Sequence, residues 1–249
     1  MQVLALYNLK GGVGKTAAAV NVAYLASLAG HRVLLWDLDP QGATSWYLRV
    51  KPKLEVKARK LLKGKVAAED VVRPTEHPRL DLIPADFSYR HMDVVIRKAG
   101  DATDLLAAVL APLADDYSLA VLDCPPSISR LSENVFEAAD ALLVPLIPSH
   151  LSLRAHEQMT DHLKKHKGVL KRMHAFFSMV DRRRKQHREW LEAPPQEIGR
   201  LLVSYIPYSA AVERMGDYRA PLEACLPGAP VSAAYRALWT EVRERVLAP

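Results

Sequence analysis

The chain contains little of what disulfide-bonded or membrane-spanning proteins need. Among its 249 residues there are two cysteines, Cys124 and Cys225, too few for a disulfide framework or a structural zinc site, so the sequence fits a reducing cytoplasm. No apolar run approaches the roughly 18 residues that cross a bilayer. The first residues already have the pattern of a strand followed by a glycine-rich turn, so we expect no signal peptide before the fold.

Repeats, low-complexity linkers and a shift in composition that would mark a second domain are also absent. We therefore expect a single domain over residues 1–249. With 49% hydrophobic residues, the chain can bury one large core. Its net charge of +6 and its pI near 9.3 favour an anionic partner, although mild basicity alone decides nothing.

Short apolar runs rich in Val, Leu and Ile alternate with helical patterns along the chain. The predicted strands are 2–8, 32–37, 80–84, 118–123, 141–146, 173–179 and 201–206, and the predicted helices are 16–29, 102–113, 129–138, 151–167 and 232–247. This alternation predicts an α/β fold of three layers, a mostly parallel twisted sheet with helices on both faces. Residues 49–79 are basic and mixed, and we expect a helical excursion over the sheet edge there.

A glycine-rich segment, residues 8–16 (NLKGGVGKT), lies between the first strand and the first helix. Glycines allow successive backbone N–H groups to face one anion, and the helix N-terminus adds the positive end of its dipole. Lys15 can reach phosphates, and the hydroxyl of Thr16 can join a Mg²⁺ shell. The usual P-loop pattern has a glycine where Leu9 stands, and a second lysine, Lys10, lies inside this loop. The segment is thus a P-loop with a deviation.

Two other interpretations of this segment are weaker. A plain strand-to-helix turn does not need the Gly-Lys-Thr ending, and a dinucleotide-binding loop needs a third glycine that is missing here. We therefore predict nucleotide binding by Lys10, Gly11, Gly12, Val13, Gly14, Lys15, Thr16 and Ala17.

Aspartates follow two of the predicted strands. Asp37 and Asp39 leave the strand 32–37 and can both face the phosphate end of the sheet, where one supports a metal shell and the other orients a water. Asp123 follows four apolar residues, the Walker B arrangement, in which the carboxylate reaches Mg²⁺ through a water. Beside it, Cys124 has no local His–acid pair to activate it, so we expect a buried packing residue.

Three strings together resemble the ParA-type partition ATPases, within the deviant Walker A group that includes MinD. They are KGGVGKT at 10–16, DLDPQG at 37–42 and DCPPS at 123–127. Weaker matches are SMVDRR at 178–183 and Ile-Pro at 206–207. The length suits the short form of the family, without an N-terminal helix-turn-helix domain.

The resemblance implies a slow ATPase that uses ATP and Mg²⁺ and forms an ATP-sandwiched homodimer, with Lys10 crossing to the nucleotide of the partner subunit. A cation supplied in this way makes dimerisation depend on the γ-phosphate. The resemblance assigns catalysis to Lys10, Lys15 and Asp39, the metal site to Thr16, Asp37 and Asp123, and adenine contacts to Met179, Asp181 and Pro207.

The family also implies nucleoid association, through non-specific binding of double-stranded DNA, and a ParB-like or cargo adaptor that stimulates hydrolysis. A dense basic segment, 164–188, is the expected DNA surface, and a dimer doubles it. Its cations are Lys164, Lys165, Lys167, Lys171, Arg172, Arg182, Arg183, Arg184, Lys185 and Arg188. After the Ile-Pro pair, the usual basic residues of the family are missing, and we expect Arg214 and Arg219 to substitute.

Three alternatives use the same fold. A MinD-like positioning ATPase on a membrane surface would use the amphipathic segment 233–247, with Leu238, Val242 and Val246 on one stripe, although such a stripe more often docks on its own sheet. An iron–sulfur reductase-type ATPase needs paired cysteines that the chain does not have. A metabolic synthetase needs a second-substrate motif, which we do not find. The cargo, whether chromosome, plasmid or protein assembly, stays open.

Overall fold

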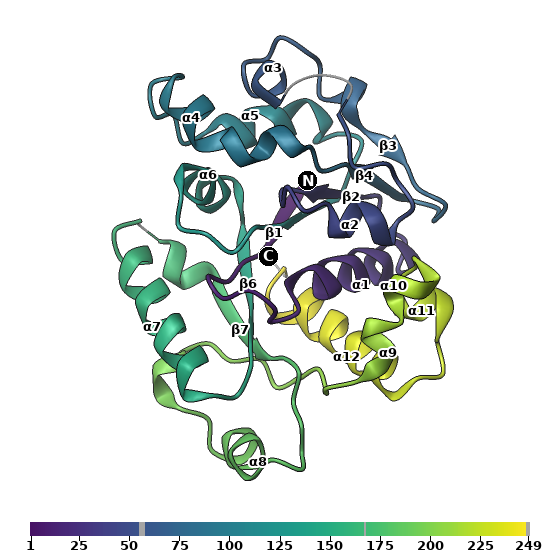
Figure 1. Cartoon of the computed structure of the whole chain (residues 1–249), viewed down its shortest axis with the longest axis vertical. Helices are drawn as coiled ribbons and strands as arrows, with labels where there is room; N and C mark the ends of the chain where they lie inside the picture. Colours follow the sequence, from purple (N-terminus) through teal and green to yellow (C-terminus); the bar gives the residue numbers. More distant parts are fainter. Residues whose placement is uncertain (55–57, 167, 248–249) are drawn as a thin grey trace.

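A twisted sheet forms the centre of the computed structural model, which describes residues 1–54, 58–166 and 168–247 (Figure 1). Its seven strands have the order β3-β4-β2-β5-β1-β6-β7. Only the edge pair β3–β4 is antiparallel among the paired strands that the structure describes. The strands are β1 (Gln2–Leu6), β2 (Val33–Asp37), β3 (Arg73–Pro74), β4 (Leu80–Ile83), β5 (Leu119–Asp123), β6 (Ala141–Leu146) and β7 (Met173–Phe177).

The central strands are buried along their whole length, as their continuous apolar sequences predict. Every residue of β2 (VLLWD) and β5 (LAVLD) is buried. In the parallel register, Asp37 pairs with Asp123, and Leu6 at the end of β1 also pairs with Asp123. The predicted acidic residues therefore meet the start of the glycine-rich loop at one edge of the sheet.

Helices cover both faces and make two cores (Figure 1). One core contains the buried faces of α1 and α12, and the other contains those of α4 to α7. The three-layer α/β class predicted from the sequence is confirmed. The helices are α1 (Lys15–Leu28), α2 (Ala43–Tyr47), α3 (Ala58–Leu62), α4 (Met92–Arg97), α5 (Leu105–Leu110), α6 (Arg130–Ala138), α7 (His150–Leu163), α8 (Lys185–Glu192), α9 (Ala210–Glu213), α10 (Met215–Tyr218), α11 (Leu222–Cys225) and α12 (Pro230–Arg245).

One predicted strand, 201–206, is wrong. This segment makes only single bridges to the sheet, Ala175 with Leu201 and Val180 with Pro207. The backbone N–H groups of Val203 and Ser204 donate to the carboxylate of Glu241 in α12, at 2.9 and 2.7 Å. The carboxylate of Glu241 thus accepts hydrogen bonds from two backbone N–H groups of the segment that was predicted to be a strand, because α12 lies close to this segment.

The expected helical excursion over residues 49–79 is partly right. It contains α3 and a short 3₁₀ turn (Glu69–Val71), but it also contains β3, which the sequence did not indicate. β3 is two residues long and ends in Pro74, whose missing N–H is tolerated at a sheet edge.

The amphipathic C-terminal segment is part of the core. In α12, Leu238 and Val242 are fully buried, and the helix packs along α1. Within the described part of the chain, no helix is both long enough and apolar enough to span a membrane.

We expect Leu238→Ala to lower the free energy of unfolding by about 2–5 kcal/mol, because it removes a fully buried side chain between α12 and α1. Urea denaturation measures this loss. The control is Val203→Ala, since Val203 is 80% exposed and should change stability by no more than about 0.5 kcal/mol. Equal effects from the two variants would contradict the packing of α12.

Candidate functional site

The glycine-rich loop joins β1 to α1 in a conformation that needs its glycines. Gly12 and Gly14 have φ values of 70° and 90°, in the left-handed region. Gly14 caps the N-terminus of α1 without a side-chain hydrogen bond. A Cβ atom at Gly14 would lie 3.0 Å from the hydroxyl oxygen of Ser178. The loop thus leaves the backbone N–H groups at the start of α1 available to an anion.

Lys15 lies almost inside the protein. Its side chain is 7% exposed, and its ammonium donates to the carbonyl oxygen of Lys10 at 3.2 Å. Burial lowers the pKa of Lys15, while the nearby Asp123 and Asp39 carboxylates act in the opposite direction. An anion bound on the loop would compensate the cost of keeping this cation out of water.

Lys10 takes a different direction. Its backbone N–H donates to Asn8 Oδ1 at 2.9 Å, and its ammonium lies 3.2 Å from the hydroxyl oxygen of Ser152 in α7. Asn8 in turn donates to the carbonyl oxygen of Pro145 at 2.7 Å. Lys10 is held toward α7 and does not line the cavity that opens above the loop.

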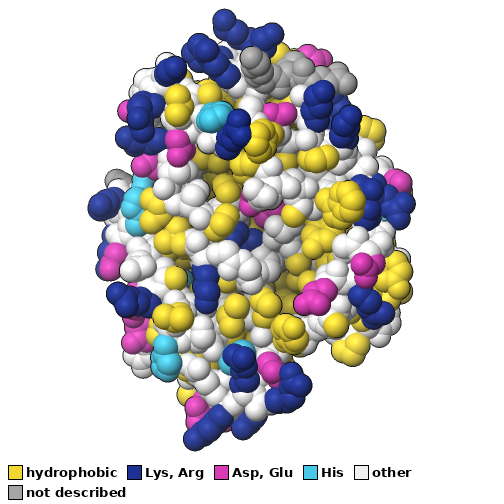
Figure 2. Space-filling view, viewed as in Figure 1, with side chains coloured by type: hydrophobic (Ala, Val, Ile, Leu, Met, Phe, Trp, Pro, Cys, Tyr) yellow, Lys and Arg dark blue, Asp and Glu magenta, His cyan; other side chains and the backbone are white. Residues whose placement is uncertain are grey.

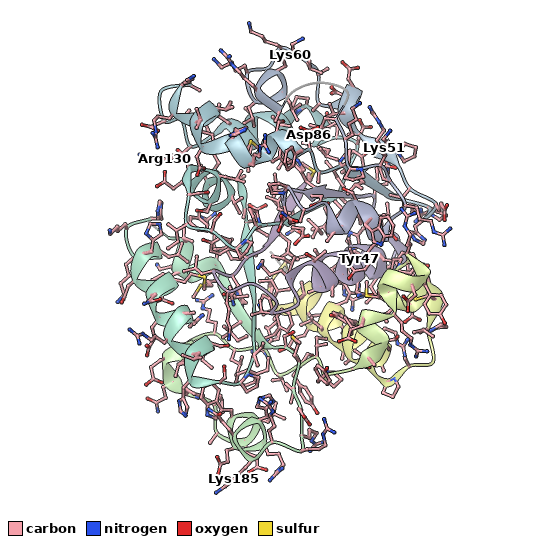
Figure 3. The ribbon with its side chains drawn as sticks, viewed as in Figure 1. Tyr47, Lys51, Lys60, Asp86, Arg130 and Lys185 are labelled. Carbon is pink, nitrogen blue, oxygen red and sulfur yellow. The ribbon has the colours of Figure 1, made fainter. Side chains whose placement is uncertain are left out.

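That cavity has a volume of about 470 Å³ and lies on the carboxyl side of the sheet. It brings together many of the predicted site residues, and Figure 3 shows Tyr47, which also lines it, near the α1–α12 side. The predicted residues that line it are Gly11, Gly12, Gly14, Lys15, Thr16, Ala17, Asp39, Met179 and Pro207. Those that do not are Lys10, Val13, Asp37, Asp123 and Asp181.

Three tyrosines in the cavity wall, Tyr47, Tyr208 and Tyr235, come from distant parts of the chain, and no sequence motif marks them. They give the cavity aromatic faces suited to a planar ring. Met179 has a positive φ of 55°, which turns the chain at the end of β7 toward the same cavity.

Asp181 does not line this cavity. Its carboxylate accepts two hydrogen bonds from the guanidinium of Arg183, both at 2.9 Å. These bonds lower the pKa of Asp181 to about 2. Both residues line a neighbouring cavity. The adenine contact that the resemblance implies for Asp181 stays a prediction, and in this structure its carboxylate is paired with Arg183.

Asp37 and Asp123 are buried beside one another, and two hydroxyl residues hold them. The backbone N–H and hydroxyl of Ser45 donate to Asp37 at 2.8 and 2.7 Å, and the hydroxyl of Thr44 donates to Asp123 at 2.7 Å. Thr44 and Ser45 were not predicted from the sequence. The signal was a pair of hydroxyl residues at the start of the helix that follows the DLDPQG string.

Burial raises the pKa values of both carboxyl groups. The pKa of Asp37 rises to about 7, through burial and then the charge of Asp123, while its bonds from Ser45 oppose the rise. The pKa of Asp123 rises to about 6 through burial, and the hydroxyls of Thr44 and Thr16 act against it. A nearby cation would keep both groups ionised.

The two aspartates differ in what they can still bind. Asp37 Oδ1 accepts from the backbone N–H of Asp39, so hydrogen bonds occupy both of its oxygens. Asp123 Oδ1 is buried and has no hydrogen-bond partner among the described residues. This vacant acceptor fits a metal-bound water. In the described segments, no group of three or more His, Cys, Asp or Glu is arranged to hold a metal ion.

Asp39 lines the cavity. Its Oδ1 accepts from the backbone N–H of Gln41 at 2.9 Å, which orients the carboxylate. Cys124 is buried, and burial raises the pKa of its thiol well above its ordinary value. The prediction that Cys124 is a packing residue is therefore confirmed.

The basic segment 164–188 is divided by β7. Lys164, Lys165 and Lys171 precede β7 and therefore lie near the amino ends of the parallel strands. Arg182 follows β7 and lies near the carboxyl ends of the strands, where the glycine-rich loop is. A strand of five residues separates the two groups by about 17 Å. Lys167 falls outside the described residues. The segment is thus two surfaces and not the one that the sequence suggested.

Several of its cations are already engaged. Arg172 donates to the carbonyl oxygens of Phe136 and Ala139 at the end of α6. Ion pairs hold others at distances of 2.7 to 3.5 Å. These are Lys164 with Asp161, Arg183 with Asp181 and Lys185 with Glu189. Arg182 and Arg184 are exposed and make no side-chain ion pair within the described residues.

Of the two substitutes expected near the C-terminus, Arg214 is exposed and Arg219 is not free. The guanidinium of Arg219 lies 4.0 Å from the ring centre of Trp46 and donates to its carbonyl oxygen. Arg219 thus ties α10 to α2 beside the cavity.

A glycine-rich loop that caps a buried helix, next to a strand-end aspartate at the carboxyl edge of a parallel sheet, defines the P-loop class of nucleotide-binding folds. Residues 1–174 match the family model described as an AAA domain. The chain is 35% identical over 175 residues to the chromosome partitioning protein ParA of Caulobacter vibrioides. That match spans 68% of this chain and 65% of the relative, a little under two thirds of its length. The chain is also 29% identical to the chromosome-partitioning ATPase Soj of Treponema pallidum, over 98% of each chain.

A solved structure shares the fold of this chain. An ATP complex of a McdA variant from Cyanothece superposes with a TM-score of 0.83, at 21% identity, over 98% of this chain and 95% of that one. The chain belongs to the ParA-type partition ATPases, as the sequence resemblance predicted.

We expect Asp123→Asn to stabilise the nucleotide-free protein more at high pH than at low pH. A carboxyl group whose pKa is higher in the folded than in the unfolded state makes the protein lose stability as the pH rises between the two values. For the pKa of Asp123 that range runs from its ordinary value of 3.8 to about 6. The amide variant lacks this loss, so its advantage should grow across that range, to the order of 1–3 kcal/mol.

Guanidinium denaturation at several pH values measures this difference. The exposed Asp217 gives the matched control, Asp217→Asn. An advantage of Asp123→Asn that shrinks toward neutral pH would contradict the cost assigned to the buried charge.

Proposed function

We propose that the chain is an ATPase switch that dimerises with ATP, binds nucleoid DNA without sequence preference, and positions DNA or protein cargo through an adaptor that stimulates hydrolysis. It would act in the cytoplasm, associated with the nucleoid. The observation that carries the proposal is the direction of Lys10, which a P-loop fold does not require. Membership in the partition family and the names of its relatives support the cargo class.

ATP fits the cavity by its chemistry. The loop and Lys15 would hold the phosphates, while Met179, Pro207 and the tyrosines of the wall would enclose the base. Mg²⁺ would be held by Thr16, by the vacant oxygen of Asp123 through water, and by phosphate oxygens. The metal would neutralise charge on the phosphates. Asp37 would support the site by holding the segment that carries Ser45.

Lys10 would act across a dimer. Its ammonium is anchored on α7 by a hydroxyl and is not directed into its own cavity. ATP with one Mg²⁺ keeps excess negative charge, which a cation from a facing subunit would neutralise. Two such contacts would make the dimer depend on the γ-phosphate, and hydrolysis would release it.

Asp39 would orient the attacking water, because it is the one of the four predicted aspartates that lines the cavity. Slow hydrolysis without an adaptor would give the ATP-bound dimer a long lifetime. An adaptor that completes the site would speed hydrolysis and shorten that lifetime.

For DNA, Arg182 and Arg184 are the best placed of the predicted cations. They are exposed at the carboxyl ends of the strands, as the glycine-rich loop is, and a dimer would bring the two subunits' copies of this surface together. Two copies multiply a weak affinity. The MinD-like alternative needs a free amphipathic C-terminal helix, and here α12 has its apolar face in the core.

We expect Lys10→Ala to bind ATP with nearly unchanged affinity but to remain a monomer. Light scattering with a non-hydrolysable ATP analogue measures the mass, which should be twice 27.7 kDa for the wild type and 27.7 kDa for the variant. Lys15→Ala is the control, and it should no longer bind ATP. A wild type that stays monomeric at every concentration would refute the switch, and a Lys10→Ala dimer of normal strength would refute the role of Lys10.

We expect the double variant Arg182→Glu, Arg184→Glu to weaken DNA binding by the ATP-loaded protein while leaving ATP affinity unchanged. Because the dimer carries two copies of each arginine, four phosphate contacts are lost, which should reduce the log–log salt slope of binding by about four. Lys164→Glu with Lys165→Glu makes the same charge change at the opposite edge. A larger loss from this second pair would assign DNA to that edge instead.

A further inference from the structure

The end of the molecule farthest from α8 carries a second basic surface (Figure 2). Residues 51–65 contain seven cations in 15 residues and one acidic residue, a higher density than the ten in 25 of segment 164–188. The seven are Lys51, Lys53, Lys57, Arg59, Lys60, Lys63 and Lys65. The structure describes all of them except Lys57. In Figure 3, Lys60 and Lys185 lie at opposite ends of the long axis.

The turn after α3 gathers four of these cations, Arg59, Lys60, Lys63 and Lys65, which we call the α3 cluster. The backbone N–H of Gly64 donates to the carbonyl oxygen of Leu61, and that of Lys65 donates to that of Lys60. Gly64 has a φ of 61°, so the chain folds back on the end of the helix. This brings Lys63 and Lys65 beside the cations of the helix itself.

The α3 cluster surrounds a surface hollow of about 320 Å³, and its four side chains are the lining residues in the part of the chain that the structure describes. All four side chains are exposed, and none makes an ion pair within the described segments. Leu61 and Leu62, in contrast, are buried and face α5. The helix is thus anchored by its apolar side and presents only cations to solvent.

Helix stability does not require four cations here. A basic residue near a helix C-terminus gains about 0.3–1 kcal/mol from the dipole, and one or two suffice to use that interaction. Four like charges around one hollow repel one another, which favours a surface that meets a polyanion.

We propose that the α3 cluster binds the phosphate backbone of duplex DNA and that it does so without nucleotide. The proposal rests on the DNA binding of the proposed function but not on its ATP switch. Long, flexible cations without base-reading side chains suit phosphate contacts. No large apolar side chain is exposed between residues 58 and 66, which disfavours insertion into a lipid surface.

Independence from nucleotide follows from position. The cluster belongs to α3 and its turn, which pack on α5, and none of its residues lines the cavity above the loop. Arg182 and Arg184 lie between β7 and α8, and Lys185, the first residue of α8, lies at the other end of the molecule in Figure 3. Each subunit would hold DNA weakly through α3 at all times, and the dimer would add the second surface when ATP is bound.

The test is fluorescence anisotropy of a labelled random-sequence duplex with nucleotide-free protein over a range of salt concentrations. We expect Lys60→Glu with Lys63→Glu to weaken binding at low salt by about tenfold or more, and to lower the log–log salt slope by about two. The control, Arg154→Glu with Arg243→Glu, makes the same charge change outside both basic surfaces and should lose much less.

The proposal is overturned if wild-type protein without nucleotide does not bind the duplex, if the α3 variant binds as well as wild type, or if the control loses as much. Binding of anionic phospholipid vesicles without binding of DNA would also overturn it. These readouts need no ATP, so they separate this proposal from failure of the switch. Should thermal melting show that the glutamate variant is unfolded, Lys60→Gln with Lys63→Gln must give the same decrease in slope.

Discussion

The site depends on charges that the fold holds out of water. Lys15, Asp37 and Asp123 are all buried at the carboxyl edge of the sheet, where burial acts against the charged form of each. Hydrogen bonds from Thr44 and Ser45 and the proximity of opposite charges compensate part of this cost. A bound phosphate would supply negative charge next to Lys15, and its metal ion would supply positive charge next to the two aspartates. Nucleotide binding and local stability are therefore linked by the same electrostatics.

The rest of the fold positions these buried charges and the residues around them. Parallel register brings the ends of β1, β2 and β5 together, so the loop and the aspartates meet without long side chains. α12 fills the face beside α1, and its Glu241 takes the donors of the segment that leads to Pro207. Lys10 is held at the adjacent α7, away from its own cavity. Cationic surfaces lie at the two ends of the long axis (Figure 2).

Much of this was predictable from local pattern. Continuous apolar runs predicted β2 and β5, and the loop in its strand–helix context predicted the cavity floor. Other features depend on side chains that meet across long sequence distances. The segment 201–206 does not form the predicted strand, and backbone N–H groups in it donate to Glu241 instead. The tyrosines of the cavity wall come from positions between 47 and 235. Local patterns do not contain such pairings, because they arise from how helices pack on the sheet.

The sequence alone determined the fold class, the phosphate-binding loop and the family, because glycine conformation, strand hydrophobicity and the spacing of lysine and aspartate are local properties. Tertiary structure decided which of these residues are buried, which way Lys10 extends and which cations are free. Arg172 and Arg183 look alike in the sequence to Arg182 and Arg184, yet the first two are tied to carbonyls or a carboxylate and the others face solvent. Only packing determines whether a charge meets a partner within the chain or remains available to another molecule.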